Sequence, residues 1–194
     1  MGTDLDAAQA DMRFGYYSGA PGIFASSAAW LAAAVVALQG SPKQAVWVLF
    51  AGGVLIHPVS VLLAKVLGRP GKHEPGNPLA TLAIATTFWL IFSLPLAYGA
   101  AILRIEWFFP AMLLVIGGRY LTFGPLFGMR IYWVLGLALA VAGYLLGSAR
   151  ALPAVSAFVG ATIEAVFAAA VLVLGRHEVR PGISFRPKPL GDTV

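Results

Sequence analysis

The sequence predicts an all-α fold, a polytopic bundle of about six transmembrane helices with both termini in the cytoplasm. Apolar residues make up 59% of the 194 residues and charged residues only 11%, whereas a soluble domain has about 25% charged residues. The apolar residues also form long runs, and about 20 consecutive apolar residues match the hydrocarbon thickness of a bilayer. A water-soluble surface could not be covered by so few charges, so the bilayer is the predicted environment.

Six apolar runs are long enough to cross a bilayer as helices. They cover residues 20–39, 45–67, 79–102, 106–123, 129–147 and 152–175. As one helix, residues 79–123 would be about 67 Å long, about twice the thickness of the bilayer core. We therefore expect the chain to turn back at Arg104–Glu106. Asn77 followed by Pro78 predicts the N-cap and first helical residue of the third span.

The distribution of lysine and arginine predicts the orientation, because cytoplasmic loops carry an excess of both. Ten lie on the side of the termini: Arg13, Lys65, Arg69, Lys72, Arg119, Arg130, Arg176, Arg180, Arg186 and Lys188. The three on the other side are Lys43, Arg104 and Arg150. We therefore expect a cytoplasmic N-terminal segment (1–15), a six-helix transmembrane domain (16–175) and a polar, mobile cytoplasmic tail (176–194).

Charge and motifs exclude several classes of protein. The net charge is +5 and the isoelectric point about 9.8, but the basic residues lie in short loops and the tail, so we expect no nucleic-acid partner. The absence of cysteine excludes disulfides and thiolate metal sites. His73 and His177 have no metal-ligand spacing, and no Walker loop, HExxH or GxSxG motif is present. We predict no catalytic residue, metal or cofactor, which argues against an enzyme without excluding one.

Glu164 is the most informative residue, because it falls near the middle of the sixth span. An ionised carboxylate at that depth costs about 2.5 to 3.5 kcal/mol on insertion scales. It shares a helical stripe with small residues, which predicts that it faces the bundle. The small residues are Ala157, Gly160, Ala161 and Ala168, and a bulky stripe of Val159, Ile163, Phe167, Val171 and Leu174 is expected to face lipid. Glu164 is either a proton- or cation-binding group or a neutral group that fixes helix packing.

His57 lies near the middle of the second span, beside Pro58. It shares a stripe with Gly53, Ser60 and Ala64, from which we expect it to face the bundle. Imidazole titrates near neutral pH, so His57 is a candidate proton-relay partner for Glu164 at a similar depth. A neutral histidine bonded to a backbone carbonyl inside the bundle is the alternative.

Four further residues are candidates for lining a polar interior at mid-membrane. Ser26 and Trp30 lie on one stripe of the first span, and Thr86 and Thr87 lie in the third. Each threonine can also bond a carbonyl of its own helix, which would give it no role in a site.

Arg119 and Arg130 bracket the loop between the fourth and fifth spans. Two guanidinium groups at a cytoplasmic mouth could bind an anion or a lipid headgroup. They could equally be topology determinants whose side chains extend to the headgroups. GxxxG spacings would allow close helix contact within the chain or in a homo-oligomer. These are Gly124/Gly128 and Gly143/Gly147.

Six spans can also arise from two inverted halves of three, which would pair the first span with the fourth. Gly19-Ala20-Pro21 ahead of Trp30 is echoed by Gly124-Pro125 ahead of Trp133. However, these belong to the first and fifth spans, which run in the same direction. The sequence therefore offers little support for an inverted repeat.

Several segments taken together resemble an uncharacterised family of small bacterial six-helix integral membrane proteins. They are PVSVLLAKVLG at 58–68, NPLATL at 77–82, Gly-Gly-Arg-Tyr with FGP at 117–125, and a tyrosine-rich start of the fifth span. The resemblance covers about residues 10–175. It implies a multi-pass protein of the bacterial cytoplasmic (inner) membrane, and it brings no activity, substrate or site residue.

These observations favour a small-solute, ion or proton transporter or channel with a polar site at mid-membrane. The alternative is a non-transporting assembly, lipid-binding or stress-associated protein whose polar core is structural. The expected partners are the lipid bilayer, a small solute, ion or proton, and a second copy through the small-residue helix faces.

Overall fold

The computed structural model describes residues 2–177 and residue 182, and in these residues all regular structure is helical. This confirms the all-α prediction. The helices are α1 (Gly2–Tyr16), α2 (Ala20–Gln39), α3 (Pro42–Val66), α4 (Ala80–Leu103), α5 (Phe108–Phe127), α6 (Ile131–Ser148) and α7 (Pro153–Leu174). Three short 3₁₀ turns are η1 (Tyr17–Gly19), η2 (Ile105–Trp107) and η3 (Gly175–His177). Most of the tail predicted at 176–194 lies outside the described residues.

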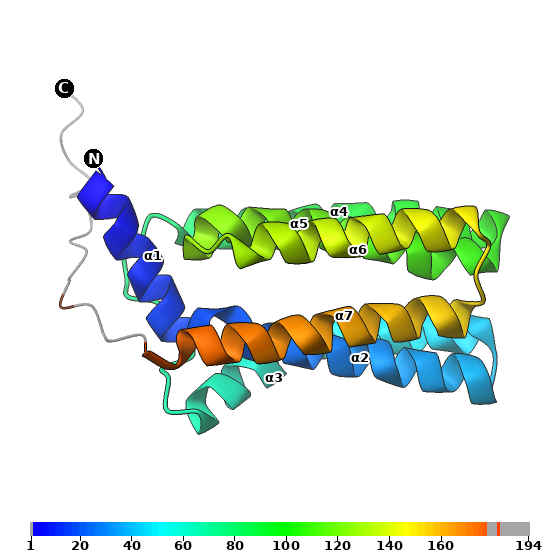
Figure 1. Ribbon diagram of the computed structural model, residues 1–194, viewed down its shortest axis with the longest axis horizontal. Coiled ribbons are helices and arrows are strands. Elements are labelled where there is room, and N and C mark those ends of the chain that lie inside the picture. Colours follow the sequence, from blue (N-terminus) through cyan, green and yellow to red (C-terminus); the bar gives the residue numbers. More distant parts are fainter. Residues whose placement is uncertain (1, 178–181, 183–194) are drawn as a thin grey trace.

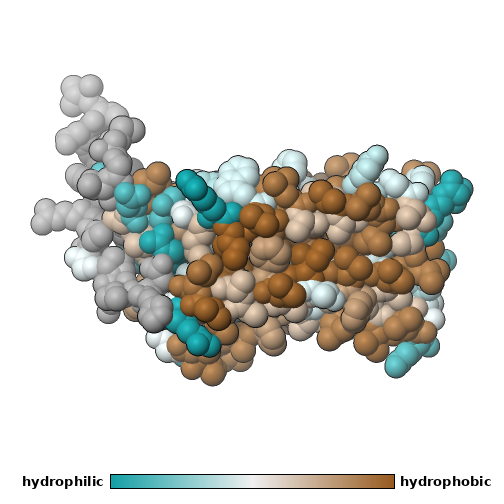
Figure 2. All heavy atoms as spheres, viewed as in Figure 1, coloured by the Kyte–Doolittle hydropathy of each residue, from teal (hydrophilic) through white to brown (hydrophobic). Residues whose placement is uncertain are grey.

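Six of these helices, α2 to α7, are long and apolar enough to cross a membrane. In Figure 2, apolar residues cover the middle of the visible face, and hydrophilic residues gather toward its two ends. The chain is therefore a multi-pass helical membrane protein. The predicted turn at Arg104–Glu106 is confirmed, since α4 ends at Leu103 and η2 follows. The fourth span continues beyond its predicted end to Phe127, through Pro125.

The spans form two layers (Figure 1). One layer contains α2, α3 and α7, and the other contains α4, α5 and α6. α1 lies across the end of the bundle near the termini, here called the terminal end (Figure 1). The opposite end, here called the far end, carries the α2–α3, α4–α5 and α6–α7 connections. The layers meet through α7, which contacts both α5 and α6.

The pairing of the spans has an internal symmetry. α2 packs most extensively on α3 and α7, and α5 packs most extensively on α6 and α4. Exchanging each span with the one three places away in the chain (α2 with α5, α3 with α6 and α4 with α7) converts the first set into the second. α2 and α5 also have equal lengths of 20 residues, and each follows a 3₁₀ turn. This is the pairing expected of two inverted halves, an arrangement that the sequence hardly indicates.

Close helix contact inside the chain depends on glycine. A Cβ at Gly117 of α5 would lie 2.7 Å from the Gly136 oxygen of α6, so the two helices can approach only without side chains there. Gly124 and Gly143 also face these neighbouring helices: a Cβ at Gly124 would lie 2.5 Å from Trp133 Nε1, and one at Gly143 would lie 2.7 Å from the Pro110 oxygen. Gly128 instead ends α5 in a left-handed conformation at φ 66°. These glycines are thus used within one chain.

α1 ties the two layers together at the terminal end. The Arg13 guanidinium donates to the Phe127 carbonyl at the end of α5 (2.8 Å). Asp11 accepts a hydrogen bond from the Asn77 amide (2.7 Å), in the loop that joins α3 to α4. Asn77 was expected to cap the third span, but that helix begins at Ala80. The Asn77 side chain accepts a hydrogen bond from the Leu79 N–H just before α4 (2.9 Å), and its amide group fixes α1 onto the loop.

Candidate functional site

Glu164 lies at the centre of the bundle, where the two layers meet. Its side chain is 0% exposed, which confirms that the small-residue stripe of α7 faces inward. Neither carboxyl oxygen makes a hydrogen bond of normal geometry. The neighbours that interact with the carboxyl group are Ser26 of α2 and both Arg119 and Tyr120 of α5. Three helices from both layers therefore supply polar groups to one buried point.

On α2, Ser26 interacts with the carboxyl group, and Trp30 lies one turn further along the same helix. Both are buried, and the Trp30 ring packs against Phe109 of α5 with centroids 6.1 Å apart. A Cβ at Gly160 would lie 3.0 Å from the Trp30 ring, so glycine makes room for the indole. The Trp30 Nε1 group is buried without a hydrogen-bond partner.

α7 is held on α2 by a hydrogen bond beside the site, from the Ser27 hydroxyl to the Ala161 carbonyl (2.8 Å). α7 also has a layer on each side, because it contacts α5 and α6 as well. For that reason the expected lipid-facing stripe is partly wrong: Val171 is 0% exposed and Phe167 is half-buried. The exposed face of α7 includes Val155, Phe158 and Val166.

Arg119 belongs to this site and not to a pair with Arg130. Arg119 lies two turns inside α5, whereas Arg130 is exposed in the turn that follows that helix. The Arg119 guanidinium sits over the Phe123 ring, 5.5 Å from its centroid, and its Nε is buried without a hydrogen-bond partner. The sequence places Arg119 at a loop because the apolar run was expected to end at residue 123. The continuation of α5 to Phe127 moves it inside the bundle.

Tyr120 and Tyr132 extend the site toward the terminal end. Tyr120 of α5 stacks on Tyr132 of α6 with centroids 6.2 Å apart. The Tyr132 hydroxyl donates to the Ser18 carbonyl, at the break between α1 and α2. At that break Ser18 and Gly19 have positive φ values of 54° and 84°. The site thus continues through tyrosines, which composition alone does not distinguish from core aromatics.

His57 is not part of the site, and the prediction that it faces the bundle interior is wrong. It is exposed on α3. α3 packs on α2 through Gly52, which approaches Ala29, and through Ser60, which approaches Gly22. A helix with one main neighbour leaves half of its circumference to lipid, and the helical stripe alone does not reveal the number of neighbours.

Thr86 and Thr87 bond their own helix. Both hydroxyls donate to the Ala83 carbonyl, at 2.9 and 3.2 Å. Thr86 is buried and Thr87 is exposed. Nothing joins either residue to Glu164 in the structure. The alternative role for these threonines fits the observed bonds.

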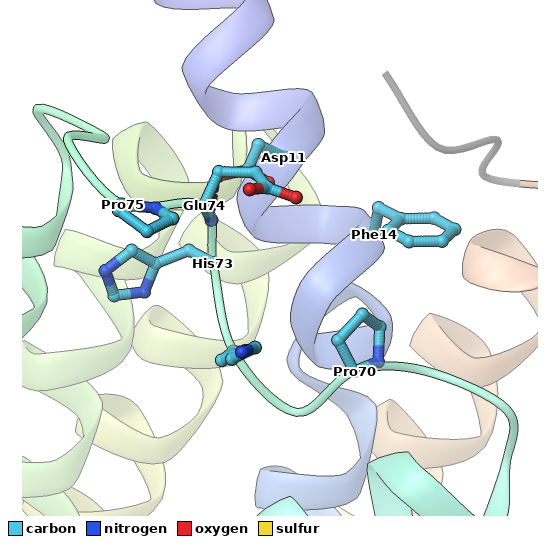
Figure 3. Close-up of a pocket in the computed structure, with 7 residues that line it drawn as sticks. Asp11, Phe14, Pro70, His73, Glu74 and Pro75 are labelled. Carbon is cyan, nitrogen blue, oxygen red and sulfur yellow. Dashed lines mark hydrogen bonds between the residues drawn. The ribbon is translucent and has the colours of Figure 1, made fainter. Parts of the chain in front are cut away.

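Two hollows lie at the ends of the bundle, away from Glu164. At the terminal end, a cavity of about 320 Å³ lies between α1 and the α3–α4 loop. Figure 3 shows Asp11 and Phe14 on α1 beside His73 and Glu74 on the loop. At the far end, a cavity of about 370 Å³ is lined by residues of α3, α4 and η2, including Lys43, Trp47 and Tyr98. Among the residues that the structure describes, no group of three or more His, Asp or Glu could hold a metal ion.

Fold and site together define a multi-pass helical membrane protein with an ionisable centre closed inside the bundle. The chain belongs to a family of unknown function (DUF7010), which it matches over residues 5–174. This agrees with the resemblance seen in the sequence. No curated protein and no solved structure matches the chain.

Proposed function

We propose that the protein is a proton-linked transporter of a small solute in the bacterial cytoplasmic membrane, and that Glu164 is its proton-binding group. One observation carries the proposal. The Glu164 carboxyl group is completely buried between the two layers, yet neither of its oxygens makes a hydrogen bond of normal geometry with the Ser26 and Tyr120 hydroxyl groups beside it. A purely structural carboxyl group at this depth would be expected to have its hydrogen bonds satisfied, because an unsatisfied one costs stability.

The position of Glu164 gives protonation a way to act on the whole bundle. Ser26 comes from one layer and Arg119 and Tyr120 come from the other. A proton on Glu164 changes the attraction between the layers, because it removes the negative charge that faces Arg119. Inverted halves that rock about a central site are a known way to expose such a site to one side at a time.

In this proposal the described structure corresponds to a closed state. Glu164 is inaccessible, and on the side proposed to be cytoplasmic α1 is bonded to both the α3–α4 loop and the end of α5. Transport would require these contacts at the terminal end to open. Tyr120 and Tyr132, which lead from Glu164 toward the α1–α2 break, mark the side from which the proton would leave.

The natural absence of cysteine makes the proposal testable by thiol labelling. Ala168→Cys would lie one turn from Glu164 toward the terminal end, and Ala157→Cys two turns toward the far end. Each would be expressed alone and treated in membranes with an impermeant thiol reagent from either side. Ser148→Cys, at the exposed far end of α6, serves as the control that is labelled at every pH from the far side.

The proposal predicts that the two buried positions are labelled from opposite sides. Their labelling rates should change in opposite directions between about pH 8 and about pH 5, the range in which a buried carboxyl can titrate. Adding Glu164→Gln should remove this pH dependence. A static structural core predicts no labelling at either position at any pH, and that result would refute transport in favour of the structural alternative.

A further inference from the structure

The charges inside the membrane domain balance. Apart from His57, which is exposed on α3, Glu164 and Arg119 are the acidic and basic side chains among the described residues that lie more than one turn inside a spanning helix. Lys43 and Lys65 lie in the first and last turns of α3. The interior therefore holds one positive and one negative group, which interact with each other although no direct ion pair joins them.

Protonation of Glu164 upsets this balance. An arginine side chain stays charged at all physiological pH values, so a proton on the carboxylate leaves the guanidinium as a single uncompensated positive charge. In a low-dielectric interior an unpaired charge is strongly unfavourable. A bound anion would restore neutrality at the moment when the proton removes the competing carboxylate.

The hydrogen-bonding groups around the site also suit an anion. Two buried N–H donors on the helices that meet at Glu164 lack an acceptor, Arg119 Nε on α5 and Trp30 Nε1 on α2. The hydroxyl groups of Ser26 and Tyr120 add two further donors near the carboxyl group. A planar guanidinium binds carboxylates and other oxyanions through two parallel hydrogen bonds.

We infer that the transported solute is a small anion of single negative charge, bound by Arg119 and carried together with one proton on Glu164. This inference rests on the proposed function and names its substrate class. The proton bonds to a Glu164 carboxyl oxygen, and the anion takes the place of that carboxylate as the partner of Arg119. One proton and one anion cross together, so transport is electroneutral.

Only Glu164 is expected to change its charge within the physiological range. The groups that face it are Ser26 from α2 and Arg119 and Tyr120 from α5, with Tyr132 of α6 behind Tyr120. Arginine and tyrosine ordinarily titrate at pH 10 or above, and serine does not titrate. His57 is exposed on the lipid side of α3 and does not face the site.

Binding of radiolabelled lactate to the purified full-length protein tests this inference, with nitrate and phosphate as competing anions. Methylammonium and glycerol serve as a cationic and a neutral probe. Because one proton is linked to one anion, the apparent affinity for lactate should fall by about tenfold per pH unit above the range in which Glu164 is protonated. Glu164→Gln should bind lactate with an affinity that does not depend on pH, since glutamine keeps the site in its neutral form.

Arg119 provides the second arm of the test. Arg119→Gln should lose anion binding at every pH. Should that variant fail to fold, Arg119→Lys keeps the charge without the planar fork and should weaken binding at least tenfold. If nitrate competes with lactate, the site accepts inorganic anions. If lactate binds and nitrate does not compete, the site is specific for carboxylates. Both outcomes support the inference.

Two results would separate this inference from the proposed function. If none of the three anions binds at millimolar concentration, or if lactate binding survives in Arg119→Gln, the anion inference is wrong. Such a result leaves pH-dependent labelling of Ala168→Cys unaffected. If labelling of Ala168→Cys does not depend on pH, the proposed function itself is wrong.

Discussion

Glu164→Gln should raise the thermal stability of the protein while abolishing its response to pH. The carboxyl group is 0% exposed, and neither oxygen makes a hydrogen bond of normal geometry. Leaving a buried polar group unsatisfied costs about 1 to 3 kcal/mol, and more for a charged one. Glutamine has nearly the same volume and no charge, and its amide group can donate to the nearby Ser26 and Tyr120 hydroxyl oxygens.

We therefore expect Glu164→Gln to raise the free energy of unfolding by about 1 to 2 kcal/mol at about pH 8, where ionisation of a carboxyl group is most favoured. For a chain of this size, each kcal/mol changes the melting temperature by about 2 to 4 °C, which gives a rise of about 2 to 8 °C. The assay is a fluorescence melt of the detergent-purified protein. In parallel, the pH dependence of labelling at Ala168→Cys is measured in membranes.

Glu106→Gln is the matched control. Glu106 lies in η2 and pairs with Arg104 at 3.4 Å in a partly exposed position. Exposed ion pairs of this kind contribute about 0 to 1 kcal/mol, so this variant should melt no more than about 4 °C below the wild type. A melting temperature for Glu164→Gln several degrees below the wild type would refute the reasoning, because it would mean that Glu164 stabilises the packing as a bonded or paired group.

Three further variants test the packing on which the site depends. Gly117→Ala should lower the free energy of unfolding by about 1 to 3 kcal/mol, because the new Cβ would lie 2.7 Å from the Gly136 oxygen. At Gly118 a new Cβ meets nothing within 4 Å, so Gly118→Ala should melt like the wild type. Asn77→Ala removes hydrogen bonds to Ala8, Asp11 and Leu79. It should lower the free energy of unfolding by about 2 to 3 kcal/mol and speed proteolysis within α1. Unchanged proteolysis would mean that α1 is held by other contacts. His57→Leu should leave the melting temperature unchanged or slightly raised and the labelling response intact, and a lost response would return His57 to the site.

Sequence reasoning identified the spans and selected the α2 and α7 residues of the candidate site. The bilayer requires about 20 apolar residues per span, so length and composition place the six helices to within a few residues. The cost of a carboxylate in the membrane singles out Glu164, and the small-residue stripe predicts the direction in which it points. Ser26 and Trp30 follow from the periodicity of the first span in the same way.

The other half of the site required the structure. Arg119 and Tyr120 reach Glu164 because α5 continues through Pro125 to Phe127, and a proline near the end of an apolar run is a poor guide to where a helix stops. His57 was misplaced for a related reason. Its stripe on α3 looks like an inward face, but α3 has α2 as its main neighbour, and the side with Gly53 and His57 is exposed.

The sequence by itself determined that the chain crosses a membrane about six times and carries a buried carboxyl group, because both follow from transfer free energies that depend on composition and depth alone. Only the tertiary structure decided which helices are neighbours. Every spanning helix is apolar around most of its circumference, so hydropathy cannot distinguish a lipid contact from a helix contact. The grouping of α2, α5 and α7 around Glu164 and the separation of His57 from it both follow from that choice of neighbours.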